Sequence, residues 1–233
     1  MRFLTDMQYS ITFDCPYIPE RDARYRMFHA VDLSHEDLEE YLSRGFRKFG
    51  TFFFKPRCIG CRSCIPIRIL TAEVAPSKSQ RRALKKAHNV TVRFREPVYT
   101  EEIFDIYLDH SQRFSPQENS AEEFIATFYT PSCPALQSEY YLDGKLFAVG
   151  FIDVSSKAFS SVYFVYRQEY GYLSPGTISV FHECTEARRM GLAWYYLGYY
   201  VEENDSMNYK NRFLPHEMMD WKSRKWLRNC SVF

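Results

Sequence analysis

The segment Tyr140-Tyr-Leu-Asp-Gly-Lys-Leu-Phe-Ala-Val-Gly-Phe-Ile-Asp-Val154 decides the fold, because two apolar, aromatic runs flank Asp143-Gly144. An Asp-Gly pair between such runs is a strong signal for a β-hairpin, since both turn residues must adopt positive φ. A further strand is predicted at Phe159–Tyr166, followed by a loop that contains Gly and Pro. The spacing then predicts a helix over about Thr177–Met190 and an aromatic strand over Ala193–Val201.

This order of hairpin, strand, loop, helix and strand is found in the acetyltransferase-like (GNAT-type) α+β fold, in which two strands splay apart around an acyl donor. Upstream, Ser34-x-x-Asp37 predicts a helix that ends near Gly45, Ile65–Leu70 a strand, and Ser79–His88 a helix. Thr100 and Ser120 are predicted helix caps. We therefore divide the chain into an N-terminal cysteine-bearing region with a basic segment, residues 1–95, and an acetyltransferase-like catalytic region, residues 96–233.

Composition and charge distribution limit the functions and cellular locations that we expect for this protein. The 233 residues carry a net charge of +1, but Lys78–Arg95 holds seven basic residues and no acid, which predicts a positive face. The aromatic share of 18% supplies core and also surfaces on which bases stack. The start, MRFLTDMQYS, is not typical of a secretory signal, and no apolar run is long enough to span a bilayer. We expect a cytoplasmic protein that does not bind membranes.

Three thiols lie in the tight loop Cys58-Ile-Gly-Cys61-Arg-Ser-Cys64. This spacing lets consecutive sulfurs face one centre, and thiolates favour Zn²⁺ or an iron–sulfur cluster. Cys15 is the natural fourth ligand. The alternative is a set of reduced cysteines packed near a turn. The other cysteines are isolated and are interpreted as structural, namely Cys133, Cys184 and Cys230.

Eight stretches, in order along the chain, carry a resemblance to a known family. They are Cys15-Pro-Tyr-Ile-Pro-Glu-Arg21, Gly45-Phe-Arg-Lys-Phe-Gly50, Lys55-Pro-Arg-Cys58 through Cys64-Ile-Pro-Ile-Arg68, Pro76-Ser-Lys-Ser-Gln-Arg-Arg82, Ser160-Ser-Val-Tyr-Phe164, Gly176-Thr177, Tyr195-Tyr-Leu-Gly-Tyr199 and Met207-Asn-Tyr-Lys210. With them the chain resembles the bacterial leucyl- or arginyl-tRNA–protein transferases of the N-degron pathway, which are related to eukaryotic arginyltransferases.

The resemblance implies transfer of leucine from leucyl-tRNA to proteins that begin with Asp or Glu, which marks them for degradation. It implies aminoacyl-tRNA and such proteins as partners, and we expect a monomer. The eukaryotic relatives bind an iron–sulfur cluster or zinc through N-terminal cysteines, which supports the assignment of the four thiols. Arg167 and Pro175 depart from the family pattern, and arginine as the donated residue stays open.

An aminoacyl-tRNA is already an activated ester, so the chemistry requires no cofactor. The enzyme must align amine and ester, stabilise the oxyanion and remove a proton from the amine. Asp153 is a candidate base, although a carboxylate at a strand end is more often solvated. Tyr163 alternates with its neighbours and is expected to face the cleft; Tyr209 and Lys210 are candidates to polarise the carbonyl.

The acceptor's acidic side chain needs a cation, preferably arginine. Candidates are Arg62 and Arg68 beside the cysteine loop, and Arg81 and Arg82 after it. Ser79 and Gln80, from the same motif as Arg81, are further candidate substrate or tRNA contacts, and Lys85 and Lys86 are candidate phosphate contacts. A solvated helix face is the competing interpretation of the basic segment.

Two other functions compete. A CoA-dependent acetyltransferase needs a Gln/Arg-x-x-Gly-x-Gly/Ala loop for the pyrophosphate, and the loop Arg167-Gln-Glu-Tyr-Gly-Tyr-Leu-Ser-Pro-Gly176 does not fit. A metal-stabilised RNA-binding module without transferase activity accounts for the basic segment and the cysteines. It leaves the aromatic C-terminal half without a role.

Overall fold

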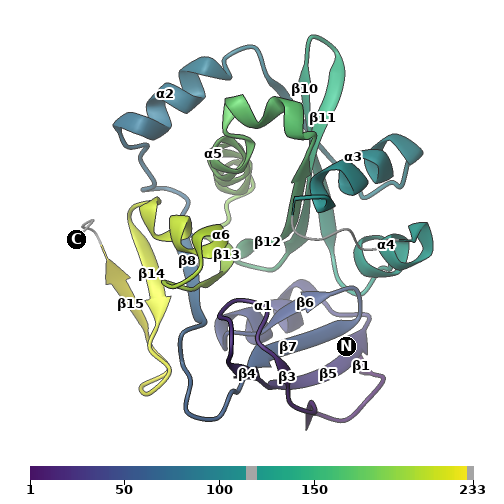
Figure 1. The fold of residues 1–233 in the computed structure, drawn as a ribbon, viewed down its shortest axis with the longest axis vertical. Coiled ribbons are helices and arrows are strands. Elements are labelled where there is room, and N and C mark those ends of the chain that lie inside the picture. Colours follow the sequence, from purple (N-terminus) through teal and green to yellow (C-terminus); the bar gives the residue numbers. More distant parts are fainter. Residues whose placement is uncertain (114–119, 230–233) are drawn as a thin grey trace.

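The computed structural model describes residues 1–113 and 120–229, which form a mixed fold of helices and mostly antiparallel sheets (Figure 1). Among these residues the large sheet has eight strands, in the order β15 (Trp226–Asn229), β14 (His216–Met219), β8 (Ile65–Leu70), β13 (Trp194–Tyr200), β12 (Ala158–Tyr166), β11 (Lys145–Val154), β10 (Ala135–Leu142) and β9 (Thr91–Arg95).

A smaller sheet lies below the large one in Figure 1. Its strands in the described residues are β1 (Arg2–Phe3), β5 (Tyr25–Val31), β7 (Phe52–Pro56) and β6 (Arg47–Phe49), with β2 (Gln8–Tyr9) also paired to β5. A separate ribbon joins β3 (Phe13–Asp14) and β4 (Asp22–Ala23). The Cys230 thiol lies outside the described residues.

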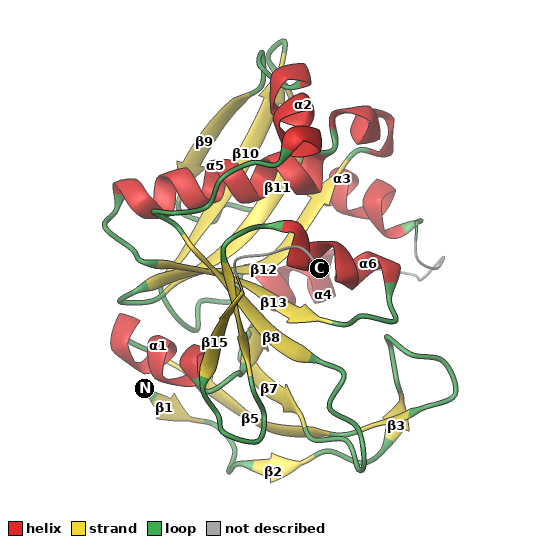
Figure 2. Cartoon of the chain, turned by 90° about the vertical axis from the view of Figure 1, so that its left-hand side faces the viewer, coloured by secondary structure: helices red, strands yellow, loops and turns green. Residues whose placement is uncertain are grey.

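The helices cover both faces of the large sheet. They are α1 (His35–Ser43), α2 (Lys78–Lys86), α3 (Glu101–Ser111), α4 (Ala121–Phe128), α5 (Pro175–Arg189) and α6 (Asp205–Asn208), with the 3₁₀ segments η1 (Gln168–Leu173) and η2 (Tyr209–Arg212). Figures 1 and 2 show α5 and α2 on one face and α3 and α4 on the other. No described helix is long and apolar enough to cross a membrane.

The predicted hairpin is confirmed. Leu142 pairs with Lys145 across a two-residue turn in which Asp143 has a φ of 52° and Gly144 a φ of 78°. Positive φ at both positions is what a type I′ turn requires, and that turn matches the twist of the two strands. The hairpin therefore fixes the register of β10 and β11 from a local signal alone.

The other predicted elements of the catalytic region are also present, as β12, α5 and β13. In the N-terminal region, the Ser34 hydroxyl accepts a hydrogen bond from the Asp37 backbone N–H, and α1 begins at the next residue after Ser34. The strands β5, β6, β9, β14 and β15 were not predicted. Distant partners fix β5 and β9, whereas β6 pairs with the next strand, β7, and β15 pairs with β14, so the patterns of these short strands were too weak to reveal them. The division at residue 95 stays a prediction, and β8 and β9 of the first region pair within the large sheet.

The strands β12 and β13 run parallel and pair only at Ala158–Trp194, Phe159–Tyr195 and Ser160–Tyr196. Both strands continue, β12 to Tyr166 and β13 to Tyr200, but without pairing to one another. We call the space between 161–166 of β12 and 197–200 of β13 the fork. Its edges expose backbone N–H and C=O groups that must find other partners.

A buried carboxylate joins α5 to the sheet beneath the fork. Glu183 accepts hydrogen bonds from Ser138 Oγ (2.8 Å), from the Tyr140 hydroxyl (3.3 Å) and from the Tyr195 hydroxyl. Burial raises the pKa of Glu183 to about 7, although the three donors oppose that shift. A Cβ atom at Gly150 would lie 2.5 Å from Glu183 Oε1, so only glycine fits beneath this carboxylate.

Candidate active site at the divergence of two parallel strands

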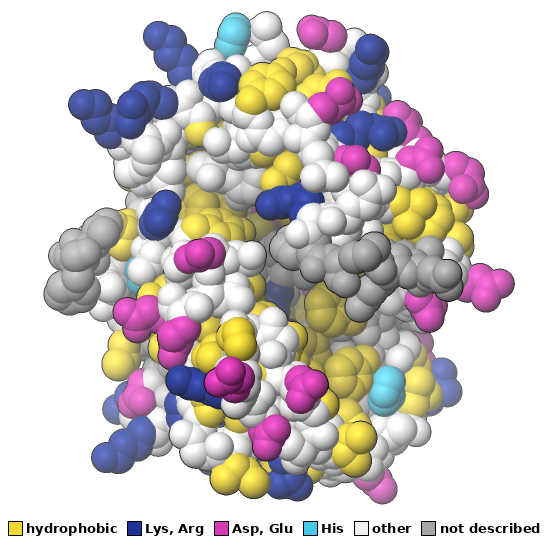
Figure 3. All heavy atoms as spheres, in the orientation of Figure 1, with side chains coloured by type: hydrophobic (Ala, Val, Ile, Leu, Met, Phe, Trp, Pro, Cys, Tyr) yellow, Lys and Arg dark blue, Asp and Glu magenta, His cyan; other side chains and the backbone are white. Residues whose placement is uncertain are grey.

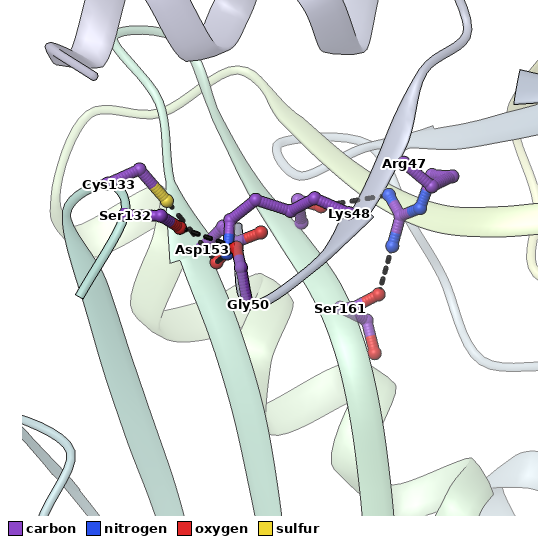
Figure 4. A network of polar contacts seen from close by, with 8 residues as sticks. Arg47, Lys48, Gly50, Ser132, Cys133, Asp153 and Ser161 are labelled. Carbon is purple, nitrogen blue, oxygen red and sulfur yellow. Dashed lines mark hydrogen bonds and ion pairs between the residues drawn. The ribbon is translucent and has the colours of Figure 1, made fainter. Parts of the chain in front are cut away.

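Arg47 of β6 enters the fork from the smaller sheet and satisfies the free edge of β12 (Figure 4). Its Nη1 donates to Ser160 Oγ at 2.8 Å, and its Nη2 donates to the carbonyl oxygen of Ser161. The side chain is only 9% exposed. Arginine keeps its charge when buried, so a fixed cation lies where the two parallel strands separate.

Lys210 approaches the same point from η2. Its Nζ donates to the carbonyl oxygen of Tyr199 at 3.1 Å. A Cβ atom at Gly198 would lie 3.6 Å from Lys210 Nζ and 3.8 Å from Arg47 Nε, so both cations reach the same stretch of β13. Burial lowers the pKa of Lys210 to about 7, Arg47 lowers it further, and Cys64 opposes the shift. A lysine with this pKa exchanges a proton near neutral pH.

Tyr209, the neighbour of Lys210, packs against the core cluster that contains Phe159 of β12 and Phe181 of α5. Burial raises its pKa to about 12, and charge on Glu183 and Tyr166 adds to the rise. Its phenol therefore stays protonated at neutral pH and acts as a hydrogen-bond donor. Tyr209 and Lys210 thus bring a donor and a titratable amine to one end of the fork.

Asp153 is not solvated, which corrects the expectation for a strand-end carboxylate. It is 3% exposed and forms an ion pair with Lys48 Nζ at 3.0 Å (Figure 4). Lys48 also donates to the carbonyl oxygen of Gly50 at 3.3 Å, and Cys133 Sγ lies 3.4 Å from Asp153 Oδ1. Burial lowers the pKa of Lys48, but the Asp153 carboxylate outweighs that effect and the net pKa is raised. The pair docks β6 onto β11.

A cavity of about 480 Å³ lies beside this ion pair. Its walls combine apolar and polar side chains: Phe128, Tyr129 and Phe151 line it together with Lys48 and Asp153. It leaves room for a reactant next to β12, on the face covered by α3 and α4.

Tyr163 lies in an aromatic cluster on that same face. Its ring stacks on Phe128 at 5.5 Å between centroids and contacts the rings of Tyr107 and His110 edge-on. A bulge in the pairing of β11 with β12 leaves Val162 without a partner, which breaks the alternation on which the expected orientation rested. The ring is part of the core beneath α3 and α4.

The guanidinium of Arg68 already has hydrogen-bond partners in this structure. Its Nε and Nη2 donate to Glu217 at 2.9 and 2.7 Å, and its Nη1 donates to the Tyr196 hydroxyl at 3.1 Å. The guanidinium also lies 3.7 Å from the ring centre of Trp194 and 4.3 Å from that of Trp226. An acceptor carboxylate would have to displace Glu217 to reach it, so Arg68 joins β8 to β13 and β14 instead.

Four predicted ligands gather around one loop. Cys58 and Cys64 are buried and Cys15 and Cys61 are half-buried. Burial raises the pKa of Cys64 to about 12, and the charges of Cys15, Cys58 and Cys61 raise it further. Cys15 packs against the core cluster that contains Cys64. Arg62 Nη1 closes the loop by donating to the carbonyl oxygens of Cys58 (3.0 Å) and Cys61 (2.6 Å). In the part of the chain described, no three His, Cys, Asp or Glu side chains are arranged to hold a metal ion.

The helix α2 carries the remaining predicted contacts. Gln80 is buried, completes a capping box with Ser77 and donates to the carbonyl oxygen of Arg212 at 3.1 Å, so its role is structural. The other candidates are exposed, namely Ser79, Arg81, Arg82, Lys85 and Lys86. The basic residues of α2 thus form a positive surface rather than a buried site.

Comparison with known proteins identifies the family. Two sequence profiles match, "Arginine-tRNA-protein transferase, N terminus" over residues 13–82 and "Arginine-tRNA-protein transferase, C terminus" over residues 100–220. The chain belongs to the arginine-tRNA-protein transferase family.

Curated relatives in this family cover nearly the whole chain. Proteins named aspartate/glutamate leucyltransferase are 29% identical in Helicobacter hepaticus and 31% identical in Campylobacter jejuni, each over 88% of this chain and 88% and 89% of theirs. The protein of that name in Halorhodospira halophila is 32% identical over 91% of this chain and 94% of its own.

Solved structures resemble the chain more weakly. L-PGS from Bacillus licheniformis has a TM-score of 0.45 and 14% identity, over 75% of this chain and 52% of its own. FemX has a TM-score of 0.47 and 9% identity, over 69% of this chain and 59% of its own.

Two residues of this family member were missed as site residues, Arg47 and Lys48. They lie within the stretch Gly45–Gly50 that carries the resemblance, and neighbouring basic residues in an otherwise aromatic strand were the available signal. Their side chains are only 9% and 8% exposed. Charged side chains are rarely buried to this extent unless they are paired, as both of these are.

Replacing Arg47 by Met should lower the free energy of unfolding by about 2–4 kcal/mol, because the Ser161 carbonyl and the Ser160 hydroxyl lose a charged donor in a buried place. Urea unfolding followed by circular dichroism measures this change. Arg44→Met is the matched control, since Arg44 forms an exposed pair with Glu40 worth about 0.5 kcal/mol at most. Equal midpoints for Arg47→Met and the unmodified protein would contradict the role of Arg47.

Proposed function

We propose that this protein transfers leucine from leucyl-tRNA to the N-terminal Asp or Glu of acceptor proteins and so marks them for degradation by the N-degron pathway. The observation that carries the proposal is similarity to proteins named aspartate/glutamate leucyltransferase over about nine-tenths of the chain. We further propose that it acts in the cytoplasm as a monomer, with aminoacyl-tRNA and the acceptor proteins as its partners.

The catalytic region is proposed to have the acetyltransferase-type arrangement. Two features support this: β12 and β13 run parallel and then diverge, and α5 connects them across one face. In that arrangement the acyl donor enters between the diverging strands. The aminoacyl ester would therefore lie in the fork, near Arg47 and Lys210.

The reaction breaks the ester bond between the leucyl carbonyl and the tRNA ribose and forms a peptide bond to the acceptor amine. The acceptor amine loses a proton, and Lys210 is the proposed proton acceptor because its pKa is about 7; the Lys210 ammonium then donates that proton to the departing ribose oxygen, which leaves as a hydroxyl. Tyr209 is the proposed donor to the carbonyl oxygen, since its phenol remains protonated. Asp153 and Tyr163 stay candidates as well, through the cavity and the aromatic cluster that lie beside β12.

The cation for the acidic acceptor side chain is proposed to be Arg81 or Arg82. Both are exposed on α2, and Arg81 Nη1 donates to the carbonyl oxygen of Pro76 at 2.7 Å. Arg68 would need to release Glu217 first. The exposed face of α2, including Lys85 and Lys86, is proposed to bind the phosphates of the tRNA acceptor stem.

Arginyl-tRNA is the second candidate donor, because the matching profiles are described as arginine-tRNA-protein transferase. The acceptors would be the same. Both donors share the reaction chemistry, so the pocket for the amino-acid side chain decides between them.

The four thiols are proposed to hold Zn²⁺ or an iron–sulfur cluster. The donor set is suitable, because thiolates are the preferred ligands of both and the four sulfurs gather around one loop. Since they are not arranged as ligands in this structure, binding is expected to draw the half-buried Cys15 and Cys61 inward. The centre would stabilise the loop, and the transfer step does not pass through it.

The transfer reaction itself gives the first prediction from the proposed function. Peptides that differ only in a first residue of Asp, Asn or Ala are offered with labelled leucyl-, arginyl- or phenylalanyl-tRNA. Leucyl-tRNA and the Asp peptide should be used about ten- to a hundredfold faster than leucyl-tRNA and the Asn peptide, because we expect the bound tRNA and peptide to bury the cation, which Asn then leaves unpaired. Arg81→Ala or Arg82→Ala should reduce that preference, whereas Arg188→Ala on α5 should not. Equal use of the three peptides would refute the acceptor, and preference for arginyl-tRNA would replace the donor.

The pH dependence gives the second prediction. The ammonium of Lys210 loses its proton as the pH rises through about 7, so the single-turnover rate should rise through that pH. The acceptor amine adds a later rise at about pH 7.7–8.0. In Lys210→Met the step near pH 7 should vanish and the maximal rate should fall by about 10²–10⁴-fold.

Lys55 provides the control, because burial lowers its pKa to about 7 as well, outside the fork. Lys55→Met should keep the step near pH 7. A profile in Lys210→Met that matches the unmodified protein would remove Lys210 from the chemistry.

The cysteines give the third prediction. Protein purified without oxygen should contain about one zinc ion or iron–sulfur cluster per chain, measured by elemental analysis and visible absorbance. Cys64→Ser should lose the metal and unfold at a lower urea concentration, because a thiolate centre contributes directly to folding. Cys184→Ser, which replaces a buried thiol outside the group, should keep the metal. Metal-free protein with four freely titrating thiols would exclude the site.

A further inference from the structure

Three aromatic rings lead from the core to the surface at η1. Phe147 of β11 is fully buried and stacks on Tyr170, with centroids 4.7 Å apart and planes 23° apart. Tyr170 in turn is nearly parallel to Tyr172, at 6.5 Å and 22°. Tyr172 is 55% exposed. The series ends in an exposed tyrosine ring that is backed by the core.

The side of Tyr172 that faces α2 is positively charged, whereas Glu169 of the same 3₁₀ segment is acidic. Lys86 Nζ of α2 lies 5.0 Å from the centre of the Tyr172 ring. The exposed cations of α2 continue from there along the helix, and no acidic residue occurs between Lys78 and Arg95. Figure 3 shows basic side chains gathered over α2 on this face. An exposed aromatic ring beside a row of cations suits a nucleotide, whose base stacks and whose phosphate is anionic.

The position of Tyr172 links it to the fork. The segment η1 begins two residues after the end of β12, the strand that forms one edge of the fork. From Ser161 to Tyr166 that strand extends roughly 17 Å, at about 3.3 Å per residue. A short single-stranded segment can span such a distance. The helix α5 begins directly after η1 with no acidic residue in its first turn, so its positive end adds to the local field.

We infer that Tyr172 is a stacking platform for an unpaired nucleotide near the 3′ end of the bound tRNA, with Lys86 on the adjoining phosphate. This inference rests on the proposed function, since it assumes that an aminoacyl-tRNA is the donor. The platform holds the single-stranded end, which carries the amino acid, while the rest of α2 contacts the paired stem. An acidic peptide would be attracted by the same cations but would gain nothing from a flat aromatic face.

The experiment measures binding of two deacylated tRNAs, one intact and one trimmed of its unpaired 3′ nucleotides. Tyr172→Ala should bind the intact tRNA roughly 5- to 150-fold more weakly, the range expected for one stacked base. Tyr172→Phe should bind within about twofold of the unmodified protein, because the ring is kept. The trimmed tRNA should bind Tyr172→Ala and the unmodified protein equally.

Tyr9→Ala is the matched control. Tyr9 is 52% exposed and has the Arg24 guanidinium 4.4 Å from its ring centre, but it lies on β2 of the smaller sheet. It should not change the affinity for either tRNA. The salt dependence of tRNA binding distinguishes a stacking contact from a phosphate contact. Lys86→Ala should reduce the slope of the logarithm of the binding constant against the logarithm of the salt concentration by about 0.7, and Tyr172→Ala should leave that slope unchanged.

Two outcomes would overturn the platform. One is unaltered binding of intact tRNA by Tyr172→Ala, and the other is an equal loss for intact and trimmed tRNA, which would place Tyr172 on the paired stem. Failure of the proposed function is a separate result, because then the unmodified protein would transfer no amino acid from any tRNA.

Discussion

The guanidinium of Arg47 is the contact on which the rest of the site depends. Where β12 and β13 stop pairing, the carbonyl of Ser161 needs a donor, and Arg47 supplies it from another sheet. The next residue of β6, Lys48, forms an ion pair with Asp153 of β11. Two consecutive side chains of one short strand therefore fasten the smaller sheet to two strands of the large one. The fork is built from both regions, and neither region contains a complete site.

Local signals in the sequence were sufficient for the elements that depend on local geometry. The Asp143-Gly144 turn, the cap at Ser34 and the bounds of Ile65–Leu70 agree with the structure because the turn, the cap and the apolar run act within a few residues. The strands β5 and β9 have partners far away in the chain, and their own patterns did not reveal them. Of the smaller sheet, the apolar run Thr51–Phe54 predicted the strand β7, whereas its partner β5 was not predicted.

The candidate site, like the fold, could be predicted only in part from the sequence. Lys210 and Tyr209 were chosen from a motif, and the structure places both at one end of the fork, but the motif did not reveal the burial that lowers the pKa of Lys210. Arg68 was chosen by charge, and charge alone did not reveal that Glu217 and two tryptophans already hold it. A sequence gives the residue types available for chemistry. Only the contacts show which of them are free to act.

The Glu183 carboxylate under the fork constrains which substitutions the chain can accept together. Because a Cβ at position 150 would lie 2.4 Å from Ser138 Oγ and 2.5 Å from Glu183 Oε1, any side chain there requires a change in one of these two partners. Substitutions at positions 138, 150 and 183 are therefore linked, although they belong to two strands and a helix. During evolution or in redesign of this protein, a side chain at position 150 should be accepted only together with a change at position 138 or 183 that makes room for it.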